Sequence, residues 1–432
     1  MERLALKRLI EWKEKKEKKP LIIQGARQVG KTWLMKTFGA SCYKKVAYIN
    51  FTNNQEAQRL FEASYHVERI ISGLSLLTEV PITIEDTLII FDEIQECEKA
   101  LNALKFFNEN AQQYAIIAAG SLLGVAVKHK KMSFPVGQVE FLNLYPLSFY
   151  EFLKALGEDK LLEVMLDKNA ALLPVVSDKC IHLLKQYFYV GGMPEVVQSF
   201  VNVRDFEQVR VLQNQLLLGY QADFSKYTEG YVIPKIHAIW DSIPVQLAKE
   251  NKKFVYKTLG PTARSRDYES AMEWLLMCGL VYKVAKITKP AIPLSAYEEP
   301  IFKLYTMDCG LLCAKASLDA KTILEGNRIF EEFKGALTEQ YVLQTLKLFE
   351  GFHVSYWASN LAEVDFVIQA QGSIIPIEVK ASTNLRARSL KSYREKYNPA
   401  MAIRTSLSNF ELNNGLYNLP LYYLETGLKV LV

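Results

Sequence analysis

Four short apolar runs alternate with segments of helical periodicity in the first 120 residues. The runs lie at 21–24, 46–50, 88–93 and 114–119. Strands that are apolar on both faces are typical of a parallel sheet covered by helices on both sides. The pattern therefore predicts an α/β domain over residues 1–150.

The periodicity changes further along the chain. Helical patterns dominate 151–225 and predict a helical lid or connector, whereas 226–325 holds shorter elements. In that second segment a helix, a turn and a strand at 279–284 resemble a winged-helix unit. Residues 326–432 read as a third, α/β domain, which opens with a helix at 330–348. Its strands are expected near 352–357, 363–368 and 374–380.

A glycine-rich loop separates the first apolar run from the following helix. Its sequence is Gly25-Ala26-Arg27-Gln28-Val29-Gly30-Lys31-Thr32. This fits G-x-x-x-x-G-K-[ST], in which backbone N–H groups and a helix N-terminus hold the phosphates of a nucleotide. We expect ATP and Mg²⁺ here, with Lys31 on the β- and γ-phosphates and Thr32 on the metal. Trp33, directly after the motif, is counted with the nucleotide-binding residues.

Two acidic residues, Asp92 and Glu93, close the third apolar run. An acid at the carboxyl end of a parallel strand faces the phosphate loop, so Asp92 is expected to hold Mg²⁺ through water. Glu93 is expected to polarise the attacking water, which favours a hydrolase over a kinase. Ser121 ends the fourth run and either senses the γ-phosphate or caps the next helix.

Composition narrows the class of protein. A chain of 432 residues predicts two or three domains, and 50% hydrophobic with 23% charged residues is ordinary for a soluble globular protein. The charged segment 11–19 is no secretory signal, and the longest apolar stretch, 115–127, is too short to span a bilayer. We therefore expect a cytoplasmic protein without a membrane partner.

The net charge of +5 is mild, but basic residues are concentrated in two patches. Residues 249–266 hold six basic residues against Glu250, and residues 380–404 hold seven against Glu395. Such patches are often solvated surface faces. Beside the motifs described here, they also make DNA or RNA an expected partner.

A second acidic motif lies in the C-terminal segment. Glu378 and Lys380 are two residues apart on an expected strand, so both side chains point to one face. A hairpin turning at 371–373 brings Asp365 opposite Glu378. Both carboxylates could then bind one metal ion, while Lys380 orients the attacking water. Exposed hairpins often carry the same residue types without any such role.

These motifs follow one another in a familiar order. Besides the glycine-rich loop, they occupy 91–95, 119–121, 145–152, 191–195, 303–311 and 363–366. In this order the chain resembles bacterial and archaeal AAA-type ATP-binding proteins with a C-terminal domain of unknown function in the PD-(D/E)xK nuclease superfamily. The resemblance implies an AAA+ P-loop NTPase core, a helical lid, a winged-helix-like middle domain and a C-terminal restriction-endonuclease-like α/β domain.

The resemblance also bears on single residues. Glu339 matches an additional metal-binding acid of some relatives. Where relatives often carry Gly-Arg, this chain has Gly137-Gln138, so it lacks an arginine there that could complete the site of a neighbouring subunit. Lysines that could replace this arginine, and thus support a homo-oligomer, are Lys128, Lys130 and Lys131.

Two functions follow from these observations. The first is a Mg²⁺-dependent ATPase coupled to a nuclease-like, nucleic-acid-directed domain. The second is a nucleotide-controlled signalling or assembly module whose nuclease-like domain is catalytically inactive and only binds a partner.

Overall fold

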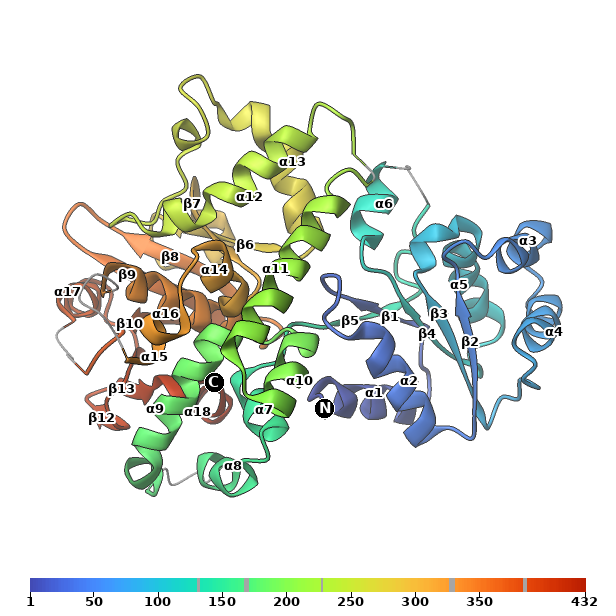
Figure 1. Ribbon diagram of the computed structural model, residues 1–432, viewed down its shortest axis with the longest axis horizontal. Coiled ribbons are helices and arrows are strands. Elements are labelled where there is room, and N and C mark those ends of the chain that lie inside the picture. The colour runs from blue at the N-terminus through green and yellow to red at the C-terminus, as the bar shows by residue number, and fades with distance from the viewer. Residues whose placement is uncertain (130–132, 167–170, 227, 326–330, 384–386) are drawn as a thin grey trace.

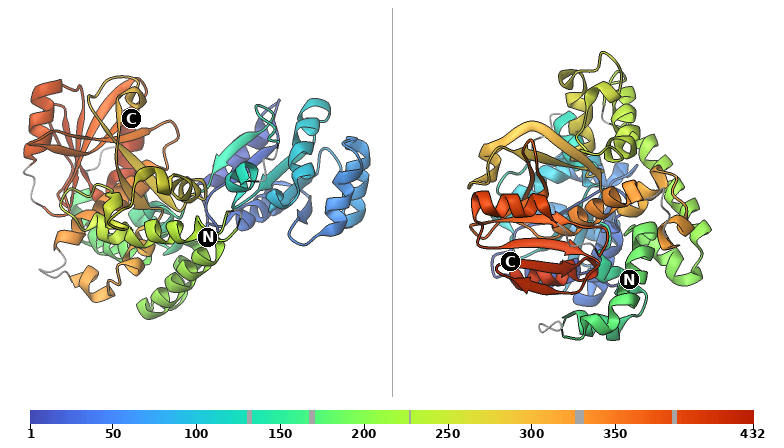
Figure 2. Two further views of the ribbon diagram at one scale, coloured as in Figure 1. Left: turned by 90° about the horizontal axis from the view of Figure 1, so that it is seen from above. Right: turned by 90° about the vertical axis from the view of Figure 1, so that its left-hand side faces the viewer.

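The computed structural model describes residues 1–129, 133–166, 171–226, 228–325, 331–383 and 387–432. Two sheets lie at opposite ends of the molecule, and helices fill the space between them (Figure 1). The view from above shows the N-terminal and C-terminal sheets in separate lobes (Figure 2). Within the described residues, every helix is too short or too polar to cross a membrane.

The N-terminal sheet has five parallel strands in the order β2-β3-β4-β1-β5. They are β1 (Leu21–Gln24), β2 (Lys45–Asn50), β3 (Thr87–Asp92), β4 (Ala115–Ala119) and β5 (Glu140–Asn143). The four apolar runs of the sequence are confirmed as strands β1 to β4. The hydrophobic pattern did not predict the fifth strand, because β5 is an edge strand in which only Leu142 is buried.

Helices cover both faces of this sheet. Side chains alternate along each strand, so Ile22 and Ile89 join one apolar cluster and Leu21 joins the other. The first face packs on α3 (Gln55–Ala63), α4 (Val67–Thr78) and α5 (Glu98–Asn110). The second face packs on α1 (Ala5–Glu14) and α2 (Lys31–Cys42). Helix α6 (Leu123–His129) follows β4.

The expected helical segment after residue 150 is confirmed as a run of helices between the two sheets (Figure 1). They are α7 (Phe149–Ala155), α8 (Asp159–Leu166), α9 (Leu173–Val190), α10 (Pro194–Val203) and α11 (Phe206–Asp223). A capping box starts α7: Ser148 Oγ accepts from Glu151 N, and the Glu151 side chain accepts from Ser148 N.

The C-terminal sheet has eight strands in the order β12-β13-β11-β10-β9-β8-β6-β7. They are β6 (Val281–Ile287), β7 (Glu298–Thr306), β8 (His353–Ala358), β9 (Glu363–Ala370), β10 (Ser373–Val379), β11 (Ala402–Ser406), β12 (Glu411–Asn413) and β13 (Leu416–Pro420). Strands β8, β9 and β10 match the three expected strands closely. The C-terminal segment is therefore α/β, as the pattern predicted.

This sheet crosses the domain boundary expected at residues 325 and 326. Strand β6 pairs in parallel with β8, with Ala285 opposite Ser355, and β7 continues the sheet beyond β6. Helices α12 (Ile233–Leu247) and α13 (Ser265–Met277) do precede a hairpin, as in the expected winged-helix-like unit. The hairpin covers the edge of β8, which would otherwise expose unpaired backbone groups, so it belongs to the C-terminal sheet.

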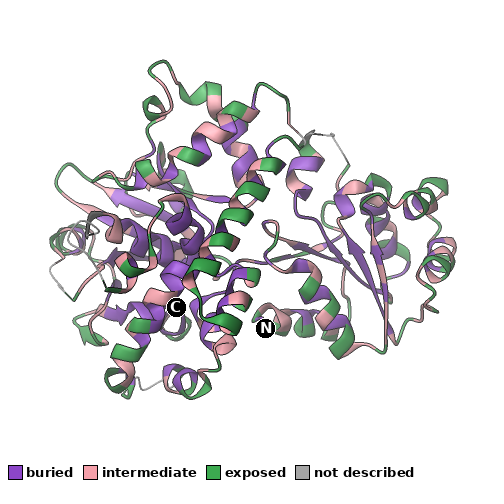
Figure 3. Ribbon diagram, in the orientation of Figure 1, coloured by how far each residue is buried: buried purple, intermediate pink, exposed green. Residues whose placement is uncertain are grey.

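The remaining helices pack around the C-terminal sheet. They are α14 (Cys309–Lys315), α15 (Ala320–Glu325), α16 (Glu331–Leu346), α17 (Arg388–Tyr397) and α18 (Leu424–Leu431). One apolar cluster runs from α1 and α2 through α9 and α16 to β10. Buried residues accordingly continue from one lobe into the other (Figure 3). The two lobes therefore share part of their core.

Candidate functional sites

The glycine-rich loop lies between β1 and α2, as its motif requires. Gly25 has φ +146° and Gly30 has φ +94°, values that favour glycine. A Cβ atom on Gly25 would lie 2.2 Å from the Leu144 carbonyl oxygen, so the close approach of this loop to the chain after β5 demands glycine. Gln28 also has a positive φ, of 65°. Together these residues give the loop a curved backbone.

Lys31, at the first position of α2, folds back onto this loop. Its Nζ donates to the carbonyl oxygens of Gly25 and Ala26, both at 2.8 Å. Burial lowers the pKa of the Lys31 ammonium to about 8, against the opposing effect of Glu93 and Asp92. The two carbonyl groups are neutral partners, so an anionic phosphate would be a stronger partner for this ammonium.

Thr32 of the loop and Asp92 at the end of β3, the two expected magnesium ligands, contact each other. Thr32 Oγ1 donates to Asp92 Oδ2 at 2.7 Å, and the Tyr48 hydroxyl donates to the same oxygen at 2.8 Å. Asp92 ends β3, and Tyr48 lies on the neighbouring strand β2. Sequence analysis assigned no role to Tyr48, and its position on the strand beside the acids was the one signal that could have identified it.

Glu93 follows Asp92 in a left-handed backbone conformation, with φ +50°. Its Oε2 accepts from Gln95 Nε2 at 2.5 Å and from Ser121 Oγ at 3.2 Å. Ser121 therefore lies beside the expected base, as a residue near the γ-phosphate would. Gln95 was part of a recognised motif, but no role was assigned to it. Its side chain fixes the carboxylate of Glu93.

Two distant segments hold the loop from outside. Arg27 Nη1 donates to Asp223 at the end of α11, at 2.5 Å to Oδ1 and 2.7 Å to Oδ2, and this contact raises the pKa of Arg27. Near the N-terminus, Arg3 Nη1 donates to the carbonyl oxygen of Val29 at 2.8 Å. Asp223 is 196 residues from Arg27 in the chain, so no local pattern could have identified it.

A cavity of about 260 Å³ opens beside the loop. Its walls include Gly25 and Ala26, Ser121, and the turn at Gly279 after α13. The middle segment thus contributes to the surroundings of the phosphate site. Trp33, by contrast, is 43% exposed and is not among the described residues that line this cavity.

Gln138 stands where relatives often carry an arginine, and its side chain bonds to a neighbour within the N-terminal domain. Gln138 Oε1 accepts from Asn108 Nδ2 at 2.5 Å. Lys128 on α6 forms an exposed ion pair with Glu273 on α13. Lys130 and Lys131 lie outside the described residues. Lys128 therefore already forms an ion pair within its own chain.

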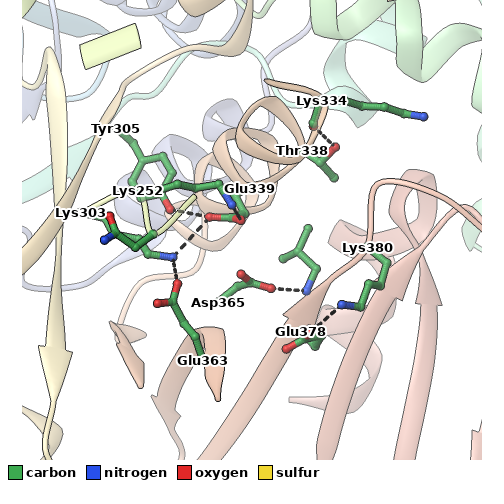
Figure 4. A network of polar contacts seen from close by, with 12 residues as sticks. Lys252, Lys303, Tyr305, Lys334, Thr338, Glu339, Glu363, Asp365, Glu378 and Lys380 are labelled. Atoms are coloured by element: carbon green, nitrogen blue, oxygen red, sulfur yellow. Dashed lines mark hydrogen bonds and ion pairs between the residues drawn. The ribbon is translucent and has the colours of Figure 1, made fainter. Parts of the chain in front are cut away.

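The second acidic motif is assembled on β9 and β10. Phe366 pairs with Ile377, so Asp365 lies across from Glu378, as the hairpin predicted. Asp365 Oδ2 accepts from the Val379 backbone N–H at 2.8 Å, and Lys380 Nζ donates to Glu378 Oε1 at 2.7 Å. Figure 4 shows these side chains on one side of the hairpin.

Glu339, the third expected metal ligand, comes from α16 and points into the same region (Figure 4). Its carboxylate is already paired: Oε1 with Lys252 Nζ at 2.5 Å, and Oε2 with the Tyr305 hydroxyl at 2.9 Å and Lys303 Nζ at 3.5 Å. Lys303 also contacts Glu363 Oε1 at 2.6 Å. Across the described ranges, no three acidic, histidine or cysteine side chains converge to hold a metal ion. Glu339 thus faces lysines in place of the metal position expected from the sequence.

Nearby lysines do not act equally on the three carboxylates of this cluster, which are those of Glu339, Asp365 and Glu378. Burial would raise the pKa of Glu339, but Lys303 and Lys252 hold it below its ordinary value. Burial, with the charges of Glu339 and Glu378, raises the pKa of Asp365 well above its ordinary value. Burial also raises the pKa of Glu378, against the effect of Lys380. Glu378 thus has one lysine partner, Lys380, whereas Glu339 has two.

The two basic patches contribute lysines to this one place. Lys252 belongs to the patch 249–266, and Lys380 begins the patch 380–404. The second patch needs a correction at its end, because Arg404 is only 9% exposed and donates to Asn418 from within β11. It is part of the sheet interior and cannot belong to a surface that grips a phosphate backbone. Residues 384–386 of the same patch, Arg386 among them, lie outside the described residues.

Three protein-family descriptions match successive parts of the chain. Residues 17–153 match an AAA domain. Residues 181–322 match a domain of unknown function (DUF8612), and residues 334–424 match a second domain of unknown function (DUF4143). Neither of these two descriptions supports a nuclease superfamily, so the nuclease-like character stays a prediction. None of the curated proteins compared with the chain matches it.

Solved structures give only remote likenesses. The Walker-type ATPase PABY2304 of Pyrococcus abyssi is 14% identical, with a TM-score of 0.43 over 72% of this chain and 94% of that one. The ORC2 protein of Aeropyrum pernix, in its ADPNP–ADP complexes, is 13% identical, with a TM-score of 0.32 over 79% and 92%. Because both TM-scores are below 0.5, we draw no argument from these structures.

The AAA match covers the whole N-terminal sheet, from β1 to β5, together with the glycine-rich loop. Its strands are parallel and their order places β1, which leads into the loop, between β4 and β5. Residues 17–153 therefore form an AAA-type domain with a P-loop.

Proposed function

We propose that the protein is a Mg²⁺-dependent ATPase whose nuclease-like C-terminal unit is directed at nucleic acid. The observation that carries the ATPase part is the contact between Thr32 and Asp92, formed beside the buried ammonium of Lys31. These are the groups that hold Mg²⁺ and the β- and γ-phosphates in P-loop ATPases.

Each group has a defined task in this proposal. Backbone N–H groups of the loop and the N-terminus of α2 hold the phosphates, and Lys31 leaves its two carbonyl partners to contact them. Thr32 and Asp92 would hold Mg²⁺, which supplies positive charge to the phosphates when bound. Glu93, fixed by Gln95 and placed beside Ser121, accepts the proton of the attacking water.

Replacing Lys31 by alanine tests the phosphate site directly. Charge-assisted hydrogen bonds contribute about 1.5–3 kcal/mol, so ATP affinity should fall by about 10- to 150-fold. Titration with a fluorescent ATP analogue measures this change. Lys44→Ala removes a lysine that is 78% exposed and should bind the analogue like the parent. Equal affinity in Lys31→Ala and the parent would refute the assignment.

The nucleic-acid part rests on the carboxylate cluster. Glu378 is a buried acid and Asp365 a half-buried one on the adjacent strand, and lysines from both basic patches lie against this cluster. Carboxylates of this kind suit a divalent cation, and lysines suit a phosphodiester backbone. Asp365 and Glu378 would hold the metal, while Lys380 would orient the attacking water.

We expect the protein to cleave supercoiled plasmid or single-stranded DNA with Mg²⁺ or Mn²⁺, and Glu378→Ala to abolish the cleavage. The Glu378 carboxylate is buried on the hairpin, with Oε1 paired to Lys380 and Oε2 without a hydrogen bond among the described residues. Gel assays with and without ATP measure the products. Glu411→Ala changes an exposed acid on β12 and should cleave like the parent. Cleavage that persists in Glu378→Ala would show that it arises elsewhere.

The alternative function is a nucleotide-controlled signalling or assembly module with a catalytically inactive C-terminal unit. The pairing of Glu339 with Lys252 and Lys303 favours it, because those ammonium groups neutralise an acid that a metal would need. No cleavage under any of the conditions above would favour this alternative. ATP hydrolysis would then be the only reaction of the protein.

A further inference from the structure

Arg27 of the phosphate loop is held by one helix at both its backbone and its side chain. The Tyr220 hydroxyl of α11 donates to the Arg27 carbonyl oxygen at 3.0 Å. Three residues further along α11, Asp223 accepts from Arg27 Nη1 at 2.5 Å to Oδ1 and 2.7 Å to Oδ2. Tyr220 and Asp223 are both buried. The helix therefore fixes the position of this side chain as well as the course of the loop.

Asp223 lies at a place that is unfavourable for an acid. It is the last residue of α11, where the partial negative charge of the helix end repels a carboxylate. Two cations offset this repulsion: Arg27, and Lys226, whose Nζ is 2.8 Å from Asp223 Oδ1. The carboxylate is therefore better explained by the guanidinium that it holds than by the helix that it ends.

This contact uses only one nitrogen of the Arg27 guanidinium. Both oxygens of Asp223 accept from Nη1, and among the described residues Nε and Nη2 of Arg27 donate no hydrogen bond. A guanidinium has five N–H donors in a planar fork, which matches the oxygens of a phosphate. The Arg27 side chain is 41% exposed. Arg27 can thus stay on Asp223 and still offer donors to an incoming anion.

The free donors are close to the groups expected at the terminal phosphate. Lys31 Nζ donates to the carbonyl oxygen of Ala26, the residue before Arg27. The hydrogen bond to Asp223 raises the pKa of Arg27, and the charge of Glu93 adds to this effect. Burial lowers the pKa of Lys31, and the charge of Arg27 adds to that effect. The guanidinium, the ammonium and the expected base are therefore close enough to act on one another.

We propose that Arg27 contacts the terminal phosphate of ATP through Nε and Nη2, and that Asp223 is the residue that positions it. This inference rests on the proposed ATP site, which it deepens by naming the side chain that distinguishes ATP from ADP. The loop thereby supplies its own guanidinium, in a chain where Gln138 leaves no arginine for the site of a neighbouring subunit. Positive charge at this place also stabilises the phosphoryl group during transfer.

Calorimetric titration of the full chain with ADP and with a non-hydrolysable ATP analogue (ADPNP), both with Mg²⁺, tests the proposal. Arg27→Ala should lower ADPNP affinity by about tenfold or more, the loss expected for a charge-assisted hydrogen bond. ADP affinity should stay nearly unchanged, because ADP lacks the phosphate that the guanidinium contacts. Arg59→Ala, which removes an exposed arginine of α3, should bind both nucleotides like the parent.

Asp223→Asn tests the positioning role, because asparagine keeps the shape of the acid and removes its charge. This variant should lose part of the preference for ADPNP over ADP and bind ADP like the parent. Combined with Arg27→Ala, it should add no further loss, since Asp223 acts through Arg27. A purely structural role of Asp223 would instead weaken both nucleotides, and its effect would add to that of Arg27→Ala.

An unchanged ratio of ADPNP to ADP affinity in Arg27→Ala would overturn the proposal, whether both affinities stay or both fall. Additive losses in the double variant would overturn the positioning role of Asp223. Arg27→Gln keeps much of the side-chain length without the charge and replaces Arg27→Ala if the alanine variant unfolds. A parent protein that binds neither nucleotide would refute the ATP site itself. The failure of the ATP site and the failure of the Arg27 contact therefore give different results.

Discussion

Replacing Glu93 by glutamine should slow ATP hydrolysis by about 100-fold or more and leave ATP affinity nearly unchanged. A positioned general base contributes about 10²–10⁴-fold to the rate, and glutamine cannot accept the proton. Its amide keeps the size of the carboxyl group and can still contact Ser121, so the pocket should retain its shape. Phosphate release under single-turnover conditions measures the rate, and titration with a fluorescent ATP analogue measures the affinity.

A matched control comes from another acid of the same domain. Glu56 is exposed in the first turn of α3, away from the phosphate loop, so Glu56→Gln should hydrolyse ATP at the parental rate. A Glu93→Gln protein that turns over ATP as fast as the parent would show that another group activates the water. Asp92 would then be the first residue to reconsider, because it is the other acid at the end of β3.

The sequence predicted the parts of this structure that depend on local pattern. Strands β1 to β4 appear in the sequence as continuous apolar runs. A parallel strand that is covered on both faces has no polar face, so its pattern is easily recognised. The hairpin that sets Asp365 against Glu378 followed from two strands and a glycine turn at Gly372. In each case neighbouring residues carry the whole signal.

Contacts between distant segments could not be predicted in this way. Asp223 reaches Arg27, and Lys252 reaches Glu339, because helices and turns far along the chain fold back onto each site. A lysine in a basic patch looks the same in sequence whether it faces solvent or a buried acid. For the same reason Arg404 was placed with a surface patch, although it is buried on β11.

Lys303→Ala should have the largest effect on stability, with a loss of about 3–5 kcal/mol in the free energy of unfolding. Lys303 is fully buried, and both Glu339 and Glu363 depend on its charge. Removing one partner of a buried ion pair leaves the other charge without compensation in a medium that solvates it poorly. Urea or guanidinium unfolding followed by circular dichroism measures the loss. Lys128→Ala breaks an exposed ion pair and should cost about 1 kcal/mol at most.

A second substitution separates the loss of charge from the loss of packing. If an uncompensated carboxylate causes most of the destabilisation, Lys303→Ala combined with Glu363→Gln should be more stable than Lys303→Ala alone, because one half-buried negative charge is gone. If the lost methylene groups dominate, the double variant should be no more stable than the single one. The first result would mean that Lys303 serves as a fixed counter-ion of the cluster.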